Sequence, residues 1–145
     1  MRYCRGMTES ADALLPLLIA DLFEAAGAAR RRGEAIAAAD GQTQARWQLL
    51  SVISEGDWTV AHAARRLGIT RQAVQRTADE LLRLGLAETE TNPNHQRSPL
   101  IRPTDEGRTA LAAMNQRARR WHAELTADLD PRDVEAARRV LRALR

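Results

Sequence analysis

Two short helical segments, joined by one tight turn and followed by a hairpin pattern, constrain the fold of this chain more than any other feature. Thr59 and Thr70 each precede apolar residues at helical spacing, and threonine is a favoured residue at a helix start. Gly68 separates the two helices, because glycine adopts the left-handed conformation that closes a helix. The pattern predicts a helix-turn-helix over residues 59–84.

A β-hairpin is predicted directly after this motif. Residues 86–91 alternate between apolar and polar side chains, which is typical of a strand. Residues 92–95 form a turn cluster, and residues 100–102 are the predicted returning strand. We expect Pro99 to limit pairing at the start of that strand and Pro103 to end it. A hairpin in this place is a wing, so the motif as a whole predicts a winged helix-turn-helix.

Longer helical patterns flank the motif on both sides. We expect a long helix over residues 10–38, with its regular part beginning near Pro16 because proline lacks the backbone N–H. A shorter helix follows over residues 43–53, and another long one begins at Thr104. A last helix begins after Asp130, with proline at its first position. The predicted fold class is mainly α, with four helices, a two-stranded wing and two further helices.

The chain of 145 residues is long enough for one domain and too short for two independent cores, so residues 1–145 are expected to form one unit. The central body, about residues 43–103, is predicted to pack around Trp47, Leu50, Leu67, Val74, Leu81 and Leu86. The terminal helices, residues 10–38 and 104–145, carry stripes too long for this body to cover, namely Leu111, Met114, Ala118, Trp121 and Leu125, then Val134, Ala137, Leu141 and Leu144. We therefore expect the terminal helices to form a dimerisation region and the protein to be a homodimer.

The outward face of the second helix of the motif carries arginine and glutamine in its N-terminal half. Gln72, Gln75 and Arg76 lie on this face, with Arg71 at its flank. Arginine and glutamine make paired hydrogen bonds to guanine and adenine edges, and this half of the helix enters the major groove in helix-turn-helix proteins. An ordinary solvated helix face is the alternative interpretation. We also expect Asp79 to orient the arginines one helical turn away by ion pairing.

The charge composition is compatible with a nucleic-acid partner. All 22 basic residues are arginine, and the formal net charge is +3. The guanidinium group suits bidentate contacts to phosphate and guanine, although the codon preference of a GC-rich genome explains the same bias. The sequence has no apolar run of about 18 residues and no recognisable signal peptide. We therefore expect a cytoplasmic protein without a membrane partner.

The residues of the motif and of the wing resemble the MarR family of transcriptional regulators. The resemblance is carried by residues 59–69 (TVAHAARRLGI), 70–76 (TRQAVQR), 92–97 (NPNHQR) and 102–107 (RPTDEG). It implies a winged-helix dimer that is clamped by its terminal helices and binds a palindromic operator in double-stranded DNA, usually as a repressor. It also implies release of DNA by small aromatic compounds in many members and by cysteine oxidation in some.

The resemblance assigns DNA contacts to the start of the second helix and to the wing. It implies base reading by residues 70–76, so the candidates there are Thr70, Arg71, Gln72, Gln75 and Arg76. Arg97 matches the wing arginine that enters the minor groove. His95, also a candidate DNA contact, stands where the family usually has an acidic residue that pairs with an arginine. Pro103 stands where the family usually has an apolar residue.

An effector pocket is the second site that the sequence suggests. Trp47 and Trp121 lie on helices that should meet between the dimerisation helices and the central body. With Phe23 and Met114 they are the candidates to bind a small aromatic effector. Plain core packing of the same side chains is the alternative interpretation.

Other chemistries find little support in the sequence. Cys4, the one cysteine, lies before any predicted element, so a redox-sensing role is not expected. The three histidines are too scattered to predict a metal site. No catalytic constellation is recognisable, so we expect neither an enzyme nor a cofactor. A winged helix that binds another protein is the alternative function, and the polar, arginine-bearing face of the second helix favours DNA over it.

Overall fold

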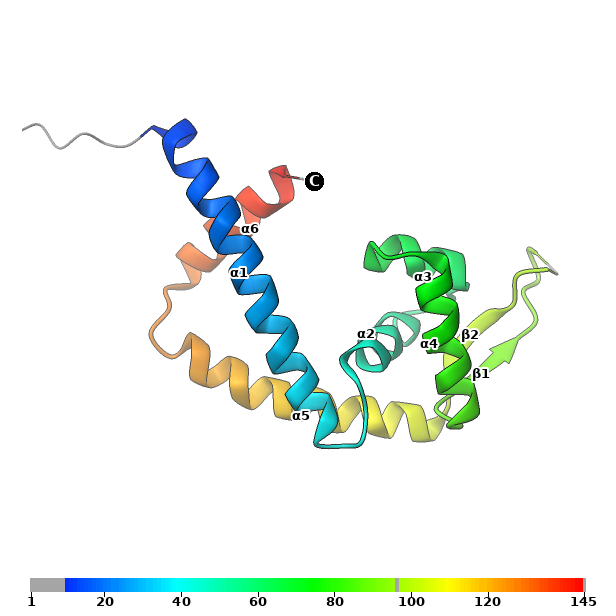
Figure 1. Cartoon of the computed structure of the whole chain (residues 1–145). Helices are drawn as coiled ribbons and strands as arrows, with labels where there is room; N and C mark the ends of the chain where they lie inside the picture. Colours follow the sequence, from blue (N-terminus) through cyan, green and yellow to red (C-terminus); the bar gives the residue numbers. More distant parts are fainter. Residues whose placement is uncertain (1–9, 96, 145) are drawn as a thin grey trace, which may run out of the picture.

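The computed structural model describes residues 10–95 and 97–144, so Cys4 lies outside the described residues. The chain forms six helices and two strands in these parts (Figure 1). They are α1 (Ala11–Ala38), α2 (Gln44–Ile53), α3 (Val60–Leu67), α4 (Arg71–Arg83), β1 (Ala87–Glu90), β2 (Leu100–Pro103), α5 (Asp105–Thr126) and α6 (Pro131–Ala143). This order is the predicted winged helix-turn-helix between terminal helices.

Side-chain oxygens cap the start of every helix. The caps accept a backbone N–H of the first turn and are Ser10, Thr43, Thr59, Thr70, Thr104 and Asp130. The predicted helix over residues 10–38 is confirmed, but its regular part begins at Ala11 rather than near Pro16 and continues through that proline. The Ser10 cap stabilises the first turn, and the missing N–H of Pro16 removes one hydrogen bond on an exposed part of the helix.

The core lies in the central body. The largest fully buried side chains come from α2, α4 and α5, and they are Leu49, Leu50, Ile53, Val74, Leu81 and Met114. Ala63 and Ala64 bury α3 against this cluster, and their small side chains let α3 approach closely. Trp47 and Leu67 are only partly buried at its margin. The core therefore holds α4 by one face and leaves its opposite face in solvent.

The wing is an antiparallel pair of strands. Ala87 pairs with Pro103 and Glu90 pairs with Leu100, and β2 begins directly after Pro99 as the prolines predicted. An additional bridge joins Trp58 to Ile101, whose backbone N–H donates to the Trp58 carbonyl oxygen at 2.8 Å. No pattern in the sequence predicts this third partner, which ties the wing to the segment between α2 and α3.

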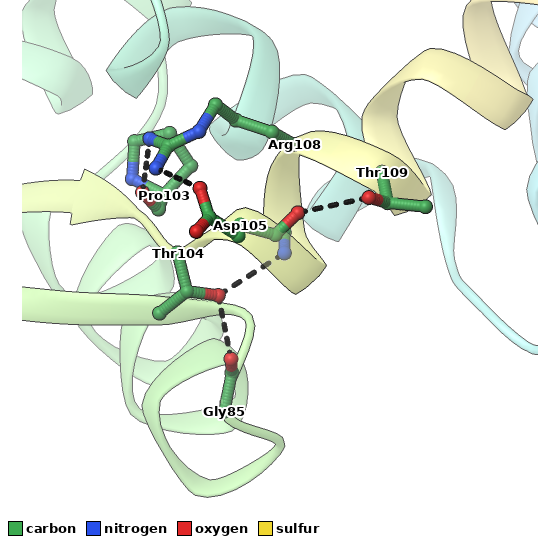
Figure 2. Close-up of polar contacts among 7 residues, drawn as sticks. Gly85, Pro103, Thr104, Asp105, Arg108 and Thr109 are labelled. Atoms are coloured by element: carbon green, nitrogen blue, oxygen red, sulfur yellow. Dashed lines mark hydrogen bonds and ion pairs between the residues drawn. The ribbon is translucent and has the colours of Figure 1, made fainter.

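A tight junction joins the end of α4 to the start of α5 (Figure 2). The Thr104 hydroxyl donates to the Gly85 carbonyl oxygen at 2.7 Å and accepts the Gly107 N–H at 3.1 Å. The Thr104 backbone N–H donates to the Leu86 carbonyl oxygen at 3.2 Å. Gly107 is buried here, and a Cβ atom at Gly107 would lie far inside van der Waals contact with the same carbonyl oxygen. The junction therefore requires glycine.

An ion pair joins the end of α1 to α5. The Arg117 guanidinium donates to both carboxylate oxygens of Asp40, at 3.0 and 2.8 Å. Hydrogen bonding to Arg117 holds the pKa of Asp40 below its ordinary value. This bidentate pair adds to the packing of Ile36 and Ala37, which are buried near the end of α1.

The terminal helices extend away from the body (Figure 1). Leu111, Met114 and Ala118 of the predicted seam on α5 are buried within the chain. Ile36 and Ala37 near the end of α1 are buried as well. Many other apolar side chains of the terminal helices are exposed, including Leu14, Leu15, Leu17, Ile19 and Phe23 on α1 and Val134, Val140, Leu141 and Leu144 at the C-terminal end. Over the described residues, no helix is both long and apolar enough to cross a membrane.

Candidate nucleic-acid interface

The free face of α4 presents the predicted reading residues. Arg71, Gln72, Gln75 and Arg76 are all exposed, while Val74, Ala78 and Leu81 on the other side are buried. Thr70 caps the helix by accepting the Ala73 N–H at 3.2 Å, which leaves the first turn well ordered. The polar side chains therefore project from a helix that is anchored firmly by its apolar face.

Asp79 orients a glutamine rather than an arginine. The Gln75 Nε2 atom donates to the Asp79 Oδ1 atom at 2.8 Å. Among the ion pairs of the described residues, none includes Asp79, so the expected pairing with neighbouring arginines is wrong. The hydrogen bond leaves Gln75 one N–H and its carbonyl oxygen, which are the donor and acceptor that an adenine edge requires.

A groove of about 160 Å³ lies between α4 and the wing. Arg71 and Gln75 line it from α4, and Arg97 and Ser98 line it from the wing. The structure thus brings together two of the predicted helix contacts and the predicted wing contact. A more open hollow of about 550 Å³ runs along the neighbouring surface of α4 and is lined by Thr70, Gln72, Ala73, Gln75, Arg76 and Asp79.

His95 lines neither of these two hollows, although its neighbour Ser98 lines the groove. It lines a separate hollow of about 330 Å³ with Asp57 and His62. The three side chains do not amount to a metal centre, since no group of three or more His, Cys, Asp or Glu side chains suited to a metal ion occurs in the parts of the chain that the structure describes.

Ion pairs connect the base of the wing to the body. The Arg102 guanidinium contacts Glu90 on β1 at 2.8 Å and Asp57 at 2.6 Å. Since Asp57 belongs to the loop that enters α3, one arginine joins both strands of the wing to the helix-turn-helix. Sequence reasoning missed Arg102, although an arginine flanked by two apolar strand residues is a usable signal.

A fourth hollow, of about 400 Å³ and open to solvent, lies between the terminal helices and the body. Trp47 and Trp121 both line it, and the Trp47 Nε1 atom donates to Asn115 at 2.9 Å. Arg66 reaches it from α3, which makes the helix-turn-helix part of its wall. The two other candidates for this pocket lie elsewhere: Met114 is fully buried in the core, and Phe23 is 76% exposed on α1.

The fold and the arginine- and glutamine-bearing face of α4 define a winged helix-turn-helix protein of the DNA-binding class. The sequence model of the MarR family matches residues 40–98, which span the helix-turn-helix and most of the wing. The chain belongs to the MarR family, whose members are DNA-binding transcriptional regulators and not enzymes.

Close relatives occur in mycobacteria. Uncharacterized proteins of Mycobacterium tuberculosis and Mycobacterium bovis are each 51% identical to this chain over 127 residues, which are 88% of this chain and 89% of theirs. The similarity therefore extends well beyond the helix-turn-helix into the terminal helices.

Solved structures share the fold at lower identity. The transcriptional regulator BldR from Sulfolobus solfataricus superposes with a TM-score of 0.83 at 17% identity, over 93% of this chain and 99% of that chain. A cysteine-to-serine mutant of MarR from E. coli, complexed with operator DNA, superposes with a TM-score of 0.78 at 21% identity, over 94% and 99%. At these identities the likeness establishes the winged-helix fold.

Proposed function

We propose that this protein is a homodimeric repressor that recognises a palindromic DNA operator in the cytoplasm. The observation that carries the proposal is the shared groove in which Arg71 and Gln75 of α4 meet Arg97 of the wing. The DNA complex of the similarly folded MarR from E. coli supports it. A protein-binding winged helix would favour an apolar α4 face, whereas this face is polar and carries arginine.

We assign base recognition and contacts with the DNA backbone to different residues. Gln72, Gln75 and Arg76 project from the half of α4 that enters the major groove in this motif, and they have the donors and acceptors to read bases. Thr70 and Arg71, at the start of the helix, are assigned to phosphate contacts. Arg97 and, at the wing tip, His95 are assigned to the DNA backbone or the minor groove.

Alanine substitutions should separate these roles. Gln72→Ala and Arg76→Ala should each relax the preference at one base pair of the half-site, by about 1–3 kcal/mol. Arg97→Ala should weaken binding to all sequences alike and lower the salt slope of binding by about two units, one for each subunit of the dimer. Titration of an operator selected from genomic DNA, and of its point variants, at several salt concentrations measures both effects.

Arg120→Ala is the matched control, since Arg120 is exposed on α5. It should change neither base preference nor affinity. Unchanged preference after both α4 substitutions, together with loss of preference in Arg97→Ala, would show that the wing rather than α4 reads the sequence.

Dimerisation is proposed to use the terminal helices. None of the residues of α6, all of which the structure describes, is buried within the single chain. Exposed leucine, isoleucine and phenylalanine side chains on α1 provide further apolar surface. Burial of this surface against a second copy would stabilise the dimer by about 25 cal/mol for each Å² of apolar area. Two copies of α4 would then address half-sites about one DNA turn apart.

The cavity between Trp47 and Trp121 is proposed to bind a small aromatic acid that weakens DNA binding. Its volume of about 400 Å³ suits such a ligand, and Arg66 offers a positive charge to a carboxylate. Because Arg66 belongs to α3, a ligand that contacts it acts directly on the helix-turn-helix. Ligand binding and DNA release are coupled if the ligand prefers a different placement of α3.

A ligand of this kind should quench tryptophan fluorescence and weaken operator binding about tenfold in parallel. Trp47→Phe and Trp121→Phe should each remove part of the quenching, because both tryptophans line the cavity. Trp58→Phe should keep it, since Trp58 lies in the wing junction rather than in the cavity. A panel of aromatic acids, screened by fluorescence and by DNA titration, provides the measurement. If no compound changes either signal, the cavity has no such regulatory role.

A further inference from the structure

Asn92 is a buried polar residue in the wing. The strand pairing of the wing does not by itself require a polar side chain at this position. The exposed fraction of Asn92 is only 8%. Among the described residues, Thr59 is the other buried polar residue, and Thr59 is accounted for by capping α3. A buried amide costs free energy unless its donor and acceptor are both bonded. The partners of Asn92 therefore indicate why an amide lies here.

The Asn92 side chain joins the two ends of the wing tip. Its Nδ2 atom donates to the Ser98 carbonyl oxygen at 2.9 Å, and its Oδ1 atom accepts the Asn94 N–H at 3.0 Å. Its backbone carbonyl oxygen accepts the His95 N–H at 3.2 Å. The His95 carbonyl oxygen in turn accepts the Ser98 N–H at 3.0 Å. One residue thus organises both the outgoing and the returning part of the tip.

These bonds act on the residue next to Ser98, which is Arg97. Both backbone groups of Ser98 are held, directly or through His95, by Asn92. Arg97 and Ser98 line the same groove as Arg71 and Gln75 of α4. An arginine whose backbone is already fixed loses less conformational entropy when it binds DNA.

We infer that Asn92 is a positioning residue for DNA binding: its side-chain amide holds the wing tip so that Arg97 faces the groove beside α4. The inference rests on the proposed DNA-binding function. An amide is required because it supplies a donor and an acceptor at once. Asn92→Asp keeps the acceptor for the Asn94 N–H, but it places a carboxylate against the Ser98 carbonyl oxygen, and Asn92→Ala removes both bonds.

A double-mutant cycle tests the inference. Operator affinity is measured for the wild type, Asn92→Ala, Asn92→Asp, Arg97→Ala and the double variant Asn92→Ala with Arg97→Ala. We expect each single substitution to weaken binding about tenfold, and the double variant to bind no more weakly than Arg97→Ala alone. Asn92→Ala should also lower the salt slope by about two units, as Arg97→Ala does, although it removes no charge, because the contact of Arg97 is lost in both subunits.

Asn94→Ala is the control, because Asn94 takes part through its backbone N–H, which the substitution keeps. It should bind as the wild type does. Base preference at the positions read by α4 should also be unchanged in Asn92→Ala. Melting curves of each variant ensure that affinities are compared between folded proteins.

Two results would overturn the inference. One is an unchanged affinity and salt slope in Asn92→Ala. The other is a double variant about a hundredfold weaker than the wild type, because independent effects multiply. Failure of the proposed function is a different result, because the wild-type protein itself would then show no preference for any DNA sequence. In that case the inference about Asn92 would fail as well.

Discussion

Replacing Gly107 with alanine should lower the free energy of unfolding by about 3 kcal/mol or more, which places the variant in the tail of single-substitution effects. The added Cβ atom would lie 2.9 Å from the carbonyl carbon of Leu86 and closer still to its oxygen. Backbone atoms cannot turn aside as a flexible side chain can. The start of α5 or the strand entering the wing must therefore move.

Chemical denaturation at one fixed protein concentration measures this effect, since the unfolding of a dimer depends on concentration. Two other helical glycines provide matched controls. Gly27→Ala would bring Cβ to an ordinary 3.5 Å contact with Arg31, so it should gain about 0.5–1 kcal/mol from helix propensity. Gly33→Ala would meet the flexible Gln44 side chain at 3.0 Å and should fall between the two. Equal stability of all three variants would contradict the close approach at Gly107.

Deleting residues 130–145 should convert the protein to a monomer or an aggregate and weaken operator binding by at least about 100-fold. The deletion removes α6, whose apolar side chains are exposed in the single chain. Two linked winged-helix units bind a palindromic operator far more tightly than one unit does, because binding of the second half-site becomes intramolecular. Sedimentation at micromolar protein and operator titration measure the two losses.

Two single substitutions distinguish a loss of dimerisation from misfolding more clearly than the deletion does. Leu141→Gln places an amide in the exposed apolar stripe of α6 and should shift the protein toward monomer, while Arg142→Gln, one position along, should leave the dimer intact. Both variants should keep the helical content of the wild type. A well-behaved monomer of the full, unsubstituted chain would refute the dimer proposal.

Local chemistry made most of the fold predictable from the sequence. Hydroxyl and carboxylate caps mark where helices begin, and Thr59, Thr70 and Asp130 begin helices as expected. Gly68 adopts the predicted left-handed conformation, with φ of 67°, and so sets the turn between α3 and α4. The buried face of α4 also followed from spacing, since period alone decides which side chains share a face.

Contacts between distant segments were the part that the sequence could not reveal. The bridge between Trp58 and Ile101 joins residues more than forty positions apart, and no local pattern encodes it. Asp79 had several neighbours at suitable spacing on its helix, and only the side-chain conformation selects Gln75. Phe23 and Met114 lie on the same helices as residues that line the cavity, but neither lines it. Met114 is buried in the core, and Phe23 lies exposed further along α1.

The outer edge of the wing has a consequence for how the protein behaves at high concentration. β2 pairs with β1 along one side and is bridged to Trp58 at Ile101 on the other, whereas β1, among the described residues, pairs with β2 alone and leaves its outer side open. Such an edge is a template onto which a strand of another molecule can add, and sheets that grow in this way lead to fibres. β1 is only four residues long and carries exposed glutamates at positions 88 and 90. The Glu90 carboxylate is paired with Arg102, so the Glu88 carboxylate is the charge that opposes an identical incoming strand. With so short an edge, we expect the wing to extend into solvent without seeding aggregation.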